Sequence, residues 1–331
     1  MAKSRLLAVL IMISFVGIAY EASYADTLFV PEDHATIQLA VDAASSGDKI
    51  NVGPGQWCGA TIAKRLDLFG QGNATIIGCT GSPVLAGVLR IGFSLSGVGA
   101  SGTTIRHFVF DGQGTSNANF DPLSFAVFAR DASDVTIEQN IIAGTIQAIT
   151  NTGGSGWTVN HNKIQDFSVL ACDGDFCGGG VGIVFQERAG TAVRQTDNAA
   201  MFNQISGVIP DNFDVFSMAG ILILGGQDGS IIQKNRIAIP DNSTSLAEGQ
   251  AIVVTDACCG ILTPFSTAIN STIAKNDGRD SELGLVITLD GGGGTGNTVG
   301  TTLRGNLGVN DINAAISDVS NRSIKTLIEF P

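Results

Sequence analysis

Three segments of the chain repeat one pattern, and this pattern decides the fold: Val135–Ile142 (VTIEQNII), Trp157–Ile164 (WTVNHNKI) and Ser230–Ile237 (SIIQKNRI). Each segment has an aliphatic residue three positions before an asparagine and an isoleucine two positions after it. Weaker copies bring the set of asparagines to six: Asn140, Asn162, Asn203, Asn235, Asn276 and Asn306. Their separations of 22, 41, 32, 41 and 30 residues indicate a repeat of about twenty residues with insertions of variable length.

A second pattern, a small residue followed by aliphatic residues, lies before each asparagine segment. Its copies are Ala126–Ala129, Ala148–Thr150, Gly182–Phe185, Gly220–Ile223, Ala251–Val254 and Gly284–Ile287. Short β-branched runs of this kind predict strands. One coil of two or three such strands cannot cover its own apolar face, whereas stacked coils can. The sequence therefore predicts an all-β solenoid.

The recurrent asparagine suits one turn of such a coil. Asparagine tolerates left-handed backbone, and stacked amides can hydrogen-bond from coil to coil. An antiparallel sandwich is the alternative, but it needs regular hairpin turns and does not explain the asparagine register. We therefore expect the six asparagines to lie in a line.

The N-terminal half begins with the best amphipathic helix pattern, in which apolar residues recur between Ile37 and Ala44. Asp33 is the expected N-cap and Gly47 the expected end of this segment. Short strand-like runs follow: Lys49–Val52, Thr61–Ile62, Leu66–Phe69, Ala74–Ile77, Val88–Ile91 and Thr104–Phe110.

Residues 1–25 have the features of a signal peptide. Lys3 and Arg5 precede an apolar stretch from Leu6 to Ala19, and small residues offer a cleavage site before Asp26. The apolar stretch is short for a membrane span. We therefore expect a secreted protein, extracellular or periplasmic, with no membrane insertion after cleavage, whose residues 26–331 form one domain.

Composition and charge limit the classes of partner that the protein is expected to bind. Of the 331 residues, 44% are hydrophobic and 15% are charged, which is typical of a globular protein. The formal net charge is −12, and no run of Lys and Arg interrupts it, which argues against a nucleic-acid partner.

Six cysteines in an exported chain are disulfide candidates: Cys58, Cys79, Cys172, Cys177, Cys258 and Cys259. Six cysteines allow about 15 pairings, between which the sequence does not decide. A zinc site is the competing interpretation, but the spacings lack a CxxC pair and His34, His107 and His161 are isolated.

The segment from Leu28 to Trp57 carries a resemblance to a known family. It contains Val30-Pro31, Ala35-Thr36-Ile37-Gln38, Gly47-Asp48-Lys49-Ile50 and Val52-Gly53-Pro54-Gly55. These residues resemble the N-terminal cap and first coil of pectin-lyase-like, right-handed parallel β-helices, and the asparagine repeats resemble the repeat that follows such caps. The resemblance covers essentially all of residues 26–331, with 26–57 as cap and first coil. It implies a right-handed parallel β-helix with an N-terminal capping helix.

In the resembled family, ligands lie outside one parallel sheet, which we identify with the small-then-aliphatic runs. Alternation points Val127, Ile149, Ile183, Ile221, Ile252 and Leu285 inward. The outward residues are Phe128, Thr150, Val184, Leu222, Val253 and Val286, an aliphatic face that would suit contact with another protein or be covered by an insertion.

Charged residues follow these strands at the next turn: Arg130, Asp131, Glu187, Arg188, Asp256 and Asp290. If the coils stack, these residues align. They would then bind calcium or sugar hydroxyls, or hold a base beside an arginine. The alternative is that they only keep the turn hydrated.

Motifs of the family's enzymes are incomplete in this chain. Asn151-Thr152-Gly153 and Arg236-Ile237-Ala238 stand where polygalacturonases carry Asn-Thr-Asp and Arg-Ile-Lys, and no Asp-Asp pair occurs. We therefore predict an exported β-helix protein that binds extracellular or cell-wall polysaccharide without catalysis. The alternative is a pectate-lyase-like enzyme with calcium as a candidate cofactor.

Overall fold

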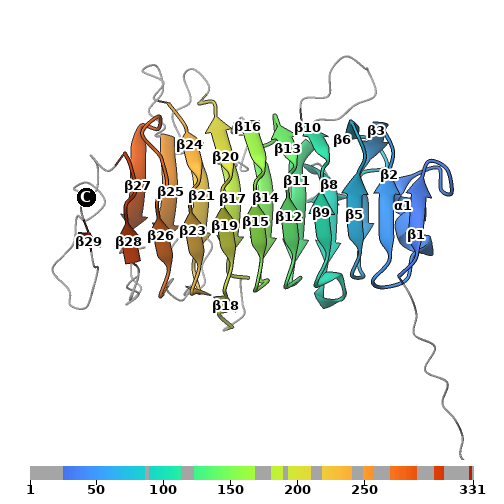
Figure 1. The fold of residues 1–331 in the computed structure, drawn as a ribbon, viewed down its shortest axis with the longest axis horizontal. Helices are drawn as coiled ribbons and strands as arrows, with labels where there is room; N and C mark the ends of the chain where they lie inside the picture. The colour runs from blue at the N-terminus through green and yellow to red at the C-terminus, as the bar shows by residue number, and fades with distance from the viewer. Residues whose placement is uncertain are drawn as a thin grey trace, which may run out of the picture.

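The computed structural model describes residues 25–85, 89–112, 123–167, 180–188, 193–209, 218–240, 249–255, 269–288, 302–308 and 328–329. These residues form a rod of stacked coils (Figure 1). Two helices occur among them, α1 (Ile37–Ala43) and the short 3-10 helix at Val98–Ala100. No helix in the described ranges reaches the length and apolarity that crossing a membrane requires.

Three long sheets run along the rod. The eleven-stranded sheet contains, in order, β1 (Thr27–Val30), β2 (Lys49–Val52), β5 (Asp67–Gly70), β9 (Thr104–Arg106), β12 (Thr136–Glu138), β15 (Thr158–Asn160), β19 (Ala199–Met201), β23 (Ile231–Gln233), β26 (Thr272–Ala274), β28 (Thr302–Arg304) and β29 (Ile328–Glu329). The seven-stranded sheet contains β24 (Arg236–Ala238), β20 (Gln204–Gly207), β16 (Lys163–Phe167), β13 (Ile141–Ala143), β10 (Val109–Asp111), β6 (Ala74–Ile77) and β3 (Gly55–Cys58).

The nine-stranded sheet contains β27 (Leu283–Thr288), β25 (Gly249–Thr255), β21 (Met218–Leu224), β17 (Val181–Gln186), β14 (Gln147–Thr152), β11 (Leu123–Arg130), β8 (Leu89–Ser96) and β4 (Ala60–Ile62), with β7 (Val84–Leu85) beside β8. A small sheet joins β18 (Gln195–Thr196) and β22 (Gln227–Asp228). Among the described strands, every pair is parallel except β7 with β8. The fold is therefore an all-β parallel β-helix, as the sequence predicts.

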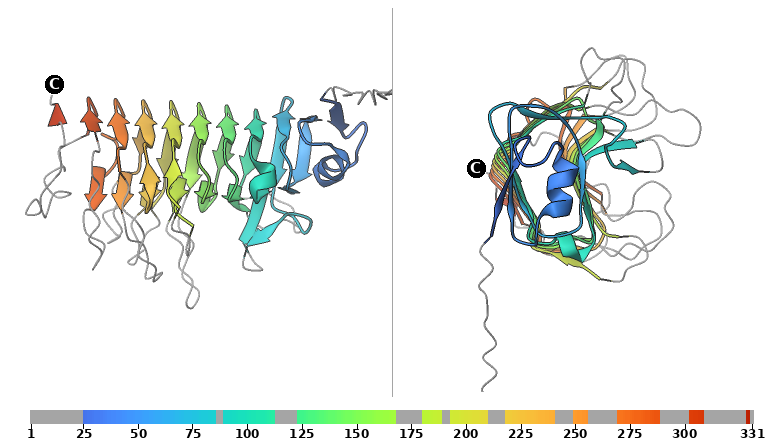
Figure 2. Two further views of the ribbon diagram at one scale, coloured as in Figure 1. Left: turned by 90° about the horizontal axis from the view of Figure 1, so that it is seen from below. Right: turned by 90° about the vertical axis from the view of Figure 1, so that its right-hand side faces the viewer.

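From β11 to β25, each coil visits the three sheets in one order. The chain leaves the nine-stranded sheet, crosses the eleven-stranded sheet, turns at an asparagine and passes through the seven-stranded sheet to the next coil (Figure 2). The six small-then-aliphatic runs pair in the predicted register, from Val127 opposite Ile149 to Ile252 opposite Leu285. Val127, Ile149 and Ile183 are fully buried inside the rod.

A ladder of buried asparagines runs along one edge of the rod. Each amide nitrogen donates to the amide oxygen of the next asparagine, at 3.0 Å from Asn140 to Asn162 and 3.1 Å from Asn162 to Asn203. The ladder continues from Asn203 through Asn235 and Asn276 to Asn306 at 2.9–3.0 Å. Each oxygen also accepts from the backbone N–H of the preceding asparagine. The predicted alignment of the six asparagines is confirmed.

The left-handed residue of this turn is not the asparagine, which corrects the sequence-based expectation. Positive φ occurs at the residue before it, as at Gln139 (56°), His161 (53°), Phe202 (57°) and Lys234 (55°). The amide therefore serves the ladder, and the preceding residue pays the conformational cost of the bend.

The N-terminal elements differ from expectation in three details. The helix ends at Ala43 with Ala44 as its C-cap, before the expected Gly47. Thr36, not Asp33, caps α1, because its hydroxyl accepts from the backbone N–H of Leu39 at 3.2 Å. The helix lies at the N-terminal end of the coils (Figure 2) and buries Ile37 and Val41. The run Thr104–Phe110 is two strands rather than one, because His107 adopts φ 61° and turns the chain there.

The outer face of the nine-stranded sheet was expected to contact another protein or to be covered by an insertion, and much of its described part is covered within the chain. Val184 is 1% exposed and Val253 is 7% exposed. With Val181 and Ala219 they form a second apolar cluster, packed against Leu222, that is separate from the core inside the rod. The described part of this face is therefore largely buried, while Leu222 and Phe128 remain partly exposed.

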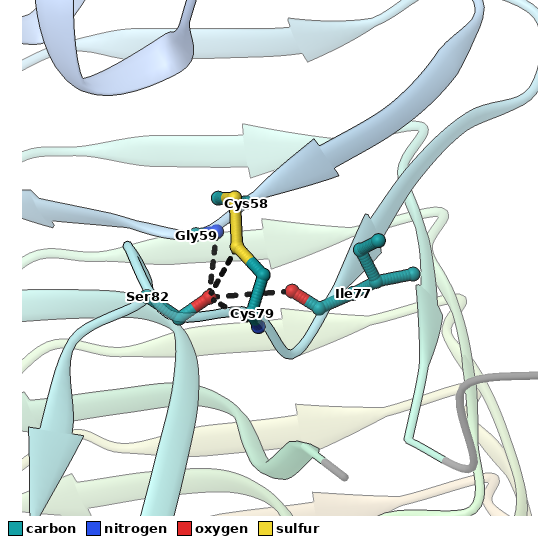
Figure 3. The surroundings of a disulfide bond; sticks show 5 residues. All are labelled: Cys58, Gly59, Ile77, Cys79 and Ser82. Carbon is teal, nitrogen blue, oxygen red and sulfur yellow. Dashed lines mark hydrogen bonds between the residues drawn. A yellow bond between two sulfur atoms is a disulfide. The ribbon is translucent and has the colours of Figure 1, made fainter. Parts of the chain in front are cut away.

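One disulfide closes the turn after β3. Cys58 is bonded to Cys79 across 21 residues (Figure 3). Ser82 supports the same loop, because its hydroxyl accepts from the backbone N–H groups of Gly59 and Cys79, both at 3.2 Å. Cys172, Cys177, Cys258 and Cys259 lie outside the described residues.

Replacing one asparagine of the ladder should cost more stability than replacing its exposed neighbour. Asn203→Ala removes the acceptor of both Asn162 donors and the donor to Val159 and Asn235. We expect a loss of about 2–4 kcal/mol in the free energy of unfolding, measured in urea, because buried groups lose partners. Gln204→Ala, one residue on, is the control, and equal losses in both variants would refute a structural role for the ladder.

The disulfide should stabilise the fold by closing a loop of the unfolded chain. Cys58→Ser/Cys79→Ser is expected to lower the free energy of unfolding by about 3 kcal/mol, because the unfolded chain regains loop entropy. Urea unfolding of the oxidised protein, the reduced protein and the double variant measures this. If reduction left the wild-type midpoint unchanged, the bridge would not stabilise the fold.

Candidate functional site

The turns that carry the ladder form a continuous edge, which we call the asparagine edge. Before each asparagine lies a left-handed residue, and His107 holds the same position before Phe108. Apart from Gly305, these residues make a row of exposed side chains: His107, Gln139, His161, Phe202, Lys234 and Lys275. Most members are joined to the next coil by a backbone hydrogen bond, such as Phe202 N–H to Gln233 O at 3.1 Å. Successive side chains are therefore held at about the 4.8 Å spacing of neighbouring strands.

An open groove interrupts this edge near its N-terminal end. Its volume is about 510 Å³, and it is lined by Phe69, Gly70, Gln71, Gly72, Asn73, His107, Phe108, Val109, Gln139 and Ile141. The lining combines rings and aliphatic side chains with three amide side chains. Ligand sites typically have this composition, with volumes of about 300–1,000 Å³.

Two of the residues that line the groove are glycines at special backbone positions. Gly70 occupies the position of His107 in the neighbouring coil, since Phe69 pairs with Arg106. A Cβ added at Gly70 would lie 2.7 Å from the carbonyl oxygen of His107, so a side chain cannot be accommodated there. Gly72 is left-handed, with φ 59°.

Phe69 is fixed by its neighbours on the eleven-stranded sheet. The ring of His107 meets it edge-on with centroids 5.0 Å apart. Lys49 Nζ lies 5.0 Å and the Arg106 guanidinium 5.7 Å from the Phe69 centroid. Arg106 also pairs with Asp67 at 2.8 Å. One wall of the groove is thus rigid, and its charges are balanced.

The charged turn predicted from sequence lies on a different edge, between the nine- and eleven-stranded sheets. Arg130 ends β11 and is exposed, and Asp131 follows it with φ 62°. Asp131 accepts a hydrogen bond from Arg188, which lies 57 residues further along the sequence. The stacking of coils brings the two residues together. Gly153 lies between them, and a Cβ there would approach Asp131 Oδ1 to 2.9 Å. The structure therefore joins Asp131 with Arg188.

Glu187 does not share this exposed position. It is only 5% exposed, and its carboxylate accepts from the backbone N–H of Gly226 at 3.0 Å. This contact stabilises the next turn. Asp256 and Asp290 lie outside the described residues, so the predicted acidic row is defined only as far as Asp131 and Glu187.

In the part of the chain that the structure describes, no three His, Cys, Asp or Glu side chains lie close enough together to hold a metal ion. The chemistry offered by the described groove is therefore that of rings, amides and backbone.

The groove was not predicted from the sequence, although one signal for it is present there. Gly70 and Gly72 flank Gln71 directly after a strand, which indicates a close backbone approach. The ring of His107 meets Phe69 from the neighbouring coil, and its left-handed backbone lies within a run that the sequence predicts as one strand.

Two ion pairs neutralise part of the asparagine edge near its C-terminal end. Arg279 donates two side-chain hydrogen bonds to Asp277, at 2.8 and 2.9 Å. These bonds, joined by the backbone hydrogen bond and the charge of Arg279, lower the pKa of Asp277 to about 2. Arg236 meets Asp280 at 3.2 Å.

Arg279→Ala should raise the pKa of Asp277 toward its ordinary value of 3.8. In the wild type, the depressed pKa means that this carboxylate favours folding above about pH 4, and that the contribution disappears as the pH falls through about 2. A carboxyl-carbon NMR titration of both proteins measures the change. An unaltered titration in Arg279→Ala would show that another group depresses the pKa.

Comparison with known proteins finds matches among solved structures alone. No protein-family model and no curated protein matches the chain. The solved structures that match include two A-modules of mannuronan C-5 epimerases from Azotobacter vinelandii. The AlgE4 module is 14% identical, with a TM-score of 0.28, over 84% of this chain and 92% of that one. The AlgE6 module is 17% identical, with a TM-score of 0.31, over 83% and 89%.

Proposed function

We propose that the protein is exported and binds extracellular or cell-wall polysaccharide in the groove beside Phe69, without transforming it. The lining of the groove carries this proposal. Sugars present apolar C–H faces and many hydroxyl groups, and the groove offers the rings of Phe69 and His107 together with the amides of Gln71, Asn73 and Gln139.

The same lining favours binding over hydrolysis. Glycoside hydrolysis generally requires two carboxylates about 5–10 Å apart, and none of the ten residues that line the groove carries one. Two acidic side chains of the adjoining eleven-stranded sheet, Asp67 and Glu138, face Arg106, at 2.8 and 3.9 Å. Their charges are therefore directed to a structural partner.

Export is supported by the Cys58–Cys79 disulfide, because such bonds persist in oxidising compartments. The signal-like pattern of residues 1–25 agrees with this. One continuous core cluster extends from Val30 to Leu303, which supports a single domain.

A second candidate function is lyase chemistry at the turn that ends the nine-stranded sheet. The observation in its favour is the contact of Arg188 with Asp131 beside exposed Arg130. An arginine near a carboxylate is an arrangement that proton abstraction uses. Product analysis in the experiment below separates this candidate from binding.

Trisaccharides test the groove because they are short enough to occupy it alone. We expect His107→Asn to weaken binding about ten-fold, since it removes one ring wall while asparagine still tolerates the left-handed turn. His34→Asn is the control, because it makes the same change of side chain at a residue that neither lines the groove nor belongs to the row of left-handed residues. Calorimetry with neutral and uronate trisaccharides measures both.

Three outcomes contradict the proposal. Absence of binding by the wild type to every glycan would remove it, and equal affinities of His107→Asn and wild type would move the site elsewhere. Unsaturated products or new reducing ends, monitored with and without calcium, would replace binding with catalysis.

A further inference from the structure

Basic residues concentrate on the C-terminal half of the asparagine edge, although the chain as a whole carries −12. Five short segments form this half: 160–164, 201–205, 233–237, 274–280 and 303–305. Within them lie six cations, Lys163, Lys234, Arg236, Lys275, Arg279 and Arg304, and two acids, Asp277 and Asp280. This part of the surface is therefore locally positive by four charges on a negative protein.

Both acidic residues form ion pairs within this surface. Asp277 holds Arg279, and Asp280 holds Arg236. Among the described residues, no ion pair joins Lys163, Lys234 or Lys275 to a carboxylate. All three lysines are exposed. Their charges are thus available to a ligand of opposite sign.

A stack of rings and a cation supports these charges. The rings of His161 and Phe202 are parallel, with centroids 4.9 Å apart and an interplanar angle of 7°. Lys234 Nζ lies 4.7 Å from the centroid of Phe202. These residues occupy equivalent positions in three successive coils, and each is turned outward by its left-handed backbone. The stack is therefore held in place before any ligand arrives.

The spacing matches a linear polymer. Lys163 and Arg304 lie four coil spacings apart, which is about 19 Å, with roughly one cation for each coil. Duplex DNA carries one charge for every ~1.7 Å, a far denser array than these cations complement. A polysaccharide with about one acidic group on each sugar has a lower charge density, which suits this edge better.

We propose that the asparagine edge from His161 to Lys275 binds an anionic polysaccharide, which runs along the rod axis and continues into the groove beside Phe69. This inference rests on the proposed glycan binding and adds the charge of the ligand. Carboxylate and sulfate groups share the chemistry that the lysines recognise, so the anionic group is left to the experiment. The row fixes the direction of the chain, because its side chains follow the rod.

The test compares polygalacturonate, dextran sulfate, neutral dextran and single-stranded DNA as probes. Lys234→Gln/Lys275→Gln should bind the preferred polyanion about ten-fold more weakly at low salt, with a shallower dependence of affinity on salt. Arg65→Gln/Arg194→Gln is the matched control. It makes the same change in charge at the turns between the nine- and eleven-stranded sheets and should bind as the wild type does.

The outcomes separate the two proposals. If trisaccharides still bind through His107 but the lysine variant retains full affinity for both polyanions, the anionic inference fails and glycan binding stands. Equal weakening in the control variant would replace the local site with a whole-protein charge effect. Tighter binding of neutral dextran, or of single-stranded DNA at equal salt, would also overturn the inference. If the wild type bound none of the glycans, both proposals would be refuted.

Discussion

The buried amide of the asparagine ladder is the constraint on which the rest of the structure depends. A primary amide inside an apolar rod must use its donors and acceptor, since each unmade hydrogen bond costs about 1–3 kcal/mol. Here each amide is satisfied only by the same residue in the next coil and by nearby backbone, as Asn162 is by Asn203 and Ile137. The ladder therefore fixes the spacing, direction and register of the coils together.

The ladder also organises the outer surface. Burying each asparagine forces the residue before it into left-handed backbone, and that residue points to solvent. Its identity is free, because the backbone hydrogen bonds hold the turn. In these positions the chain places rings at His161 and Phe202 and cations at Lys234 and Lys275, and His107 adopts the same backbone conformation before Phe108. One structural requirement thus yields an aligned row of variable side chains, which is a suitable surface for a repeating polymer.

Sequence reasoning was strongest where the repeat was local. The pairing of Val127 with Ile149 and the alignment of Asn140 with Asn162 both follow from periodicity. It was weaker where a single residue decided the path, as at His107, whose left-handed turn divides one predicted strand into two. Glu187 shows the same limit, because its carboxylate is directed inward to Gly226 by a coil that lies 39 residues further on.

The sequence by itself determined the solenoid, its repeat and the residues that stack, because these depend on spacing along the chain. Only the tertiary structure decided that Cys58 bonds Cys79, that Val184 is covered and that Phe69 meets His107 beside an open groove. Each of these features depends on where a distant segment places its backbone and side chains in space. Such placement follows from the packing of whole coils, and no local pattern of residues records it.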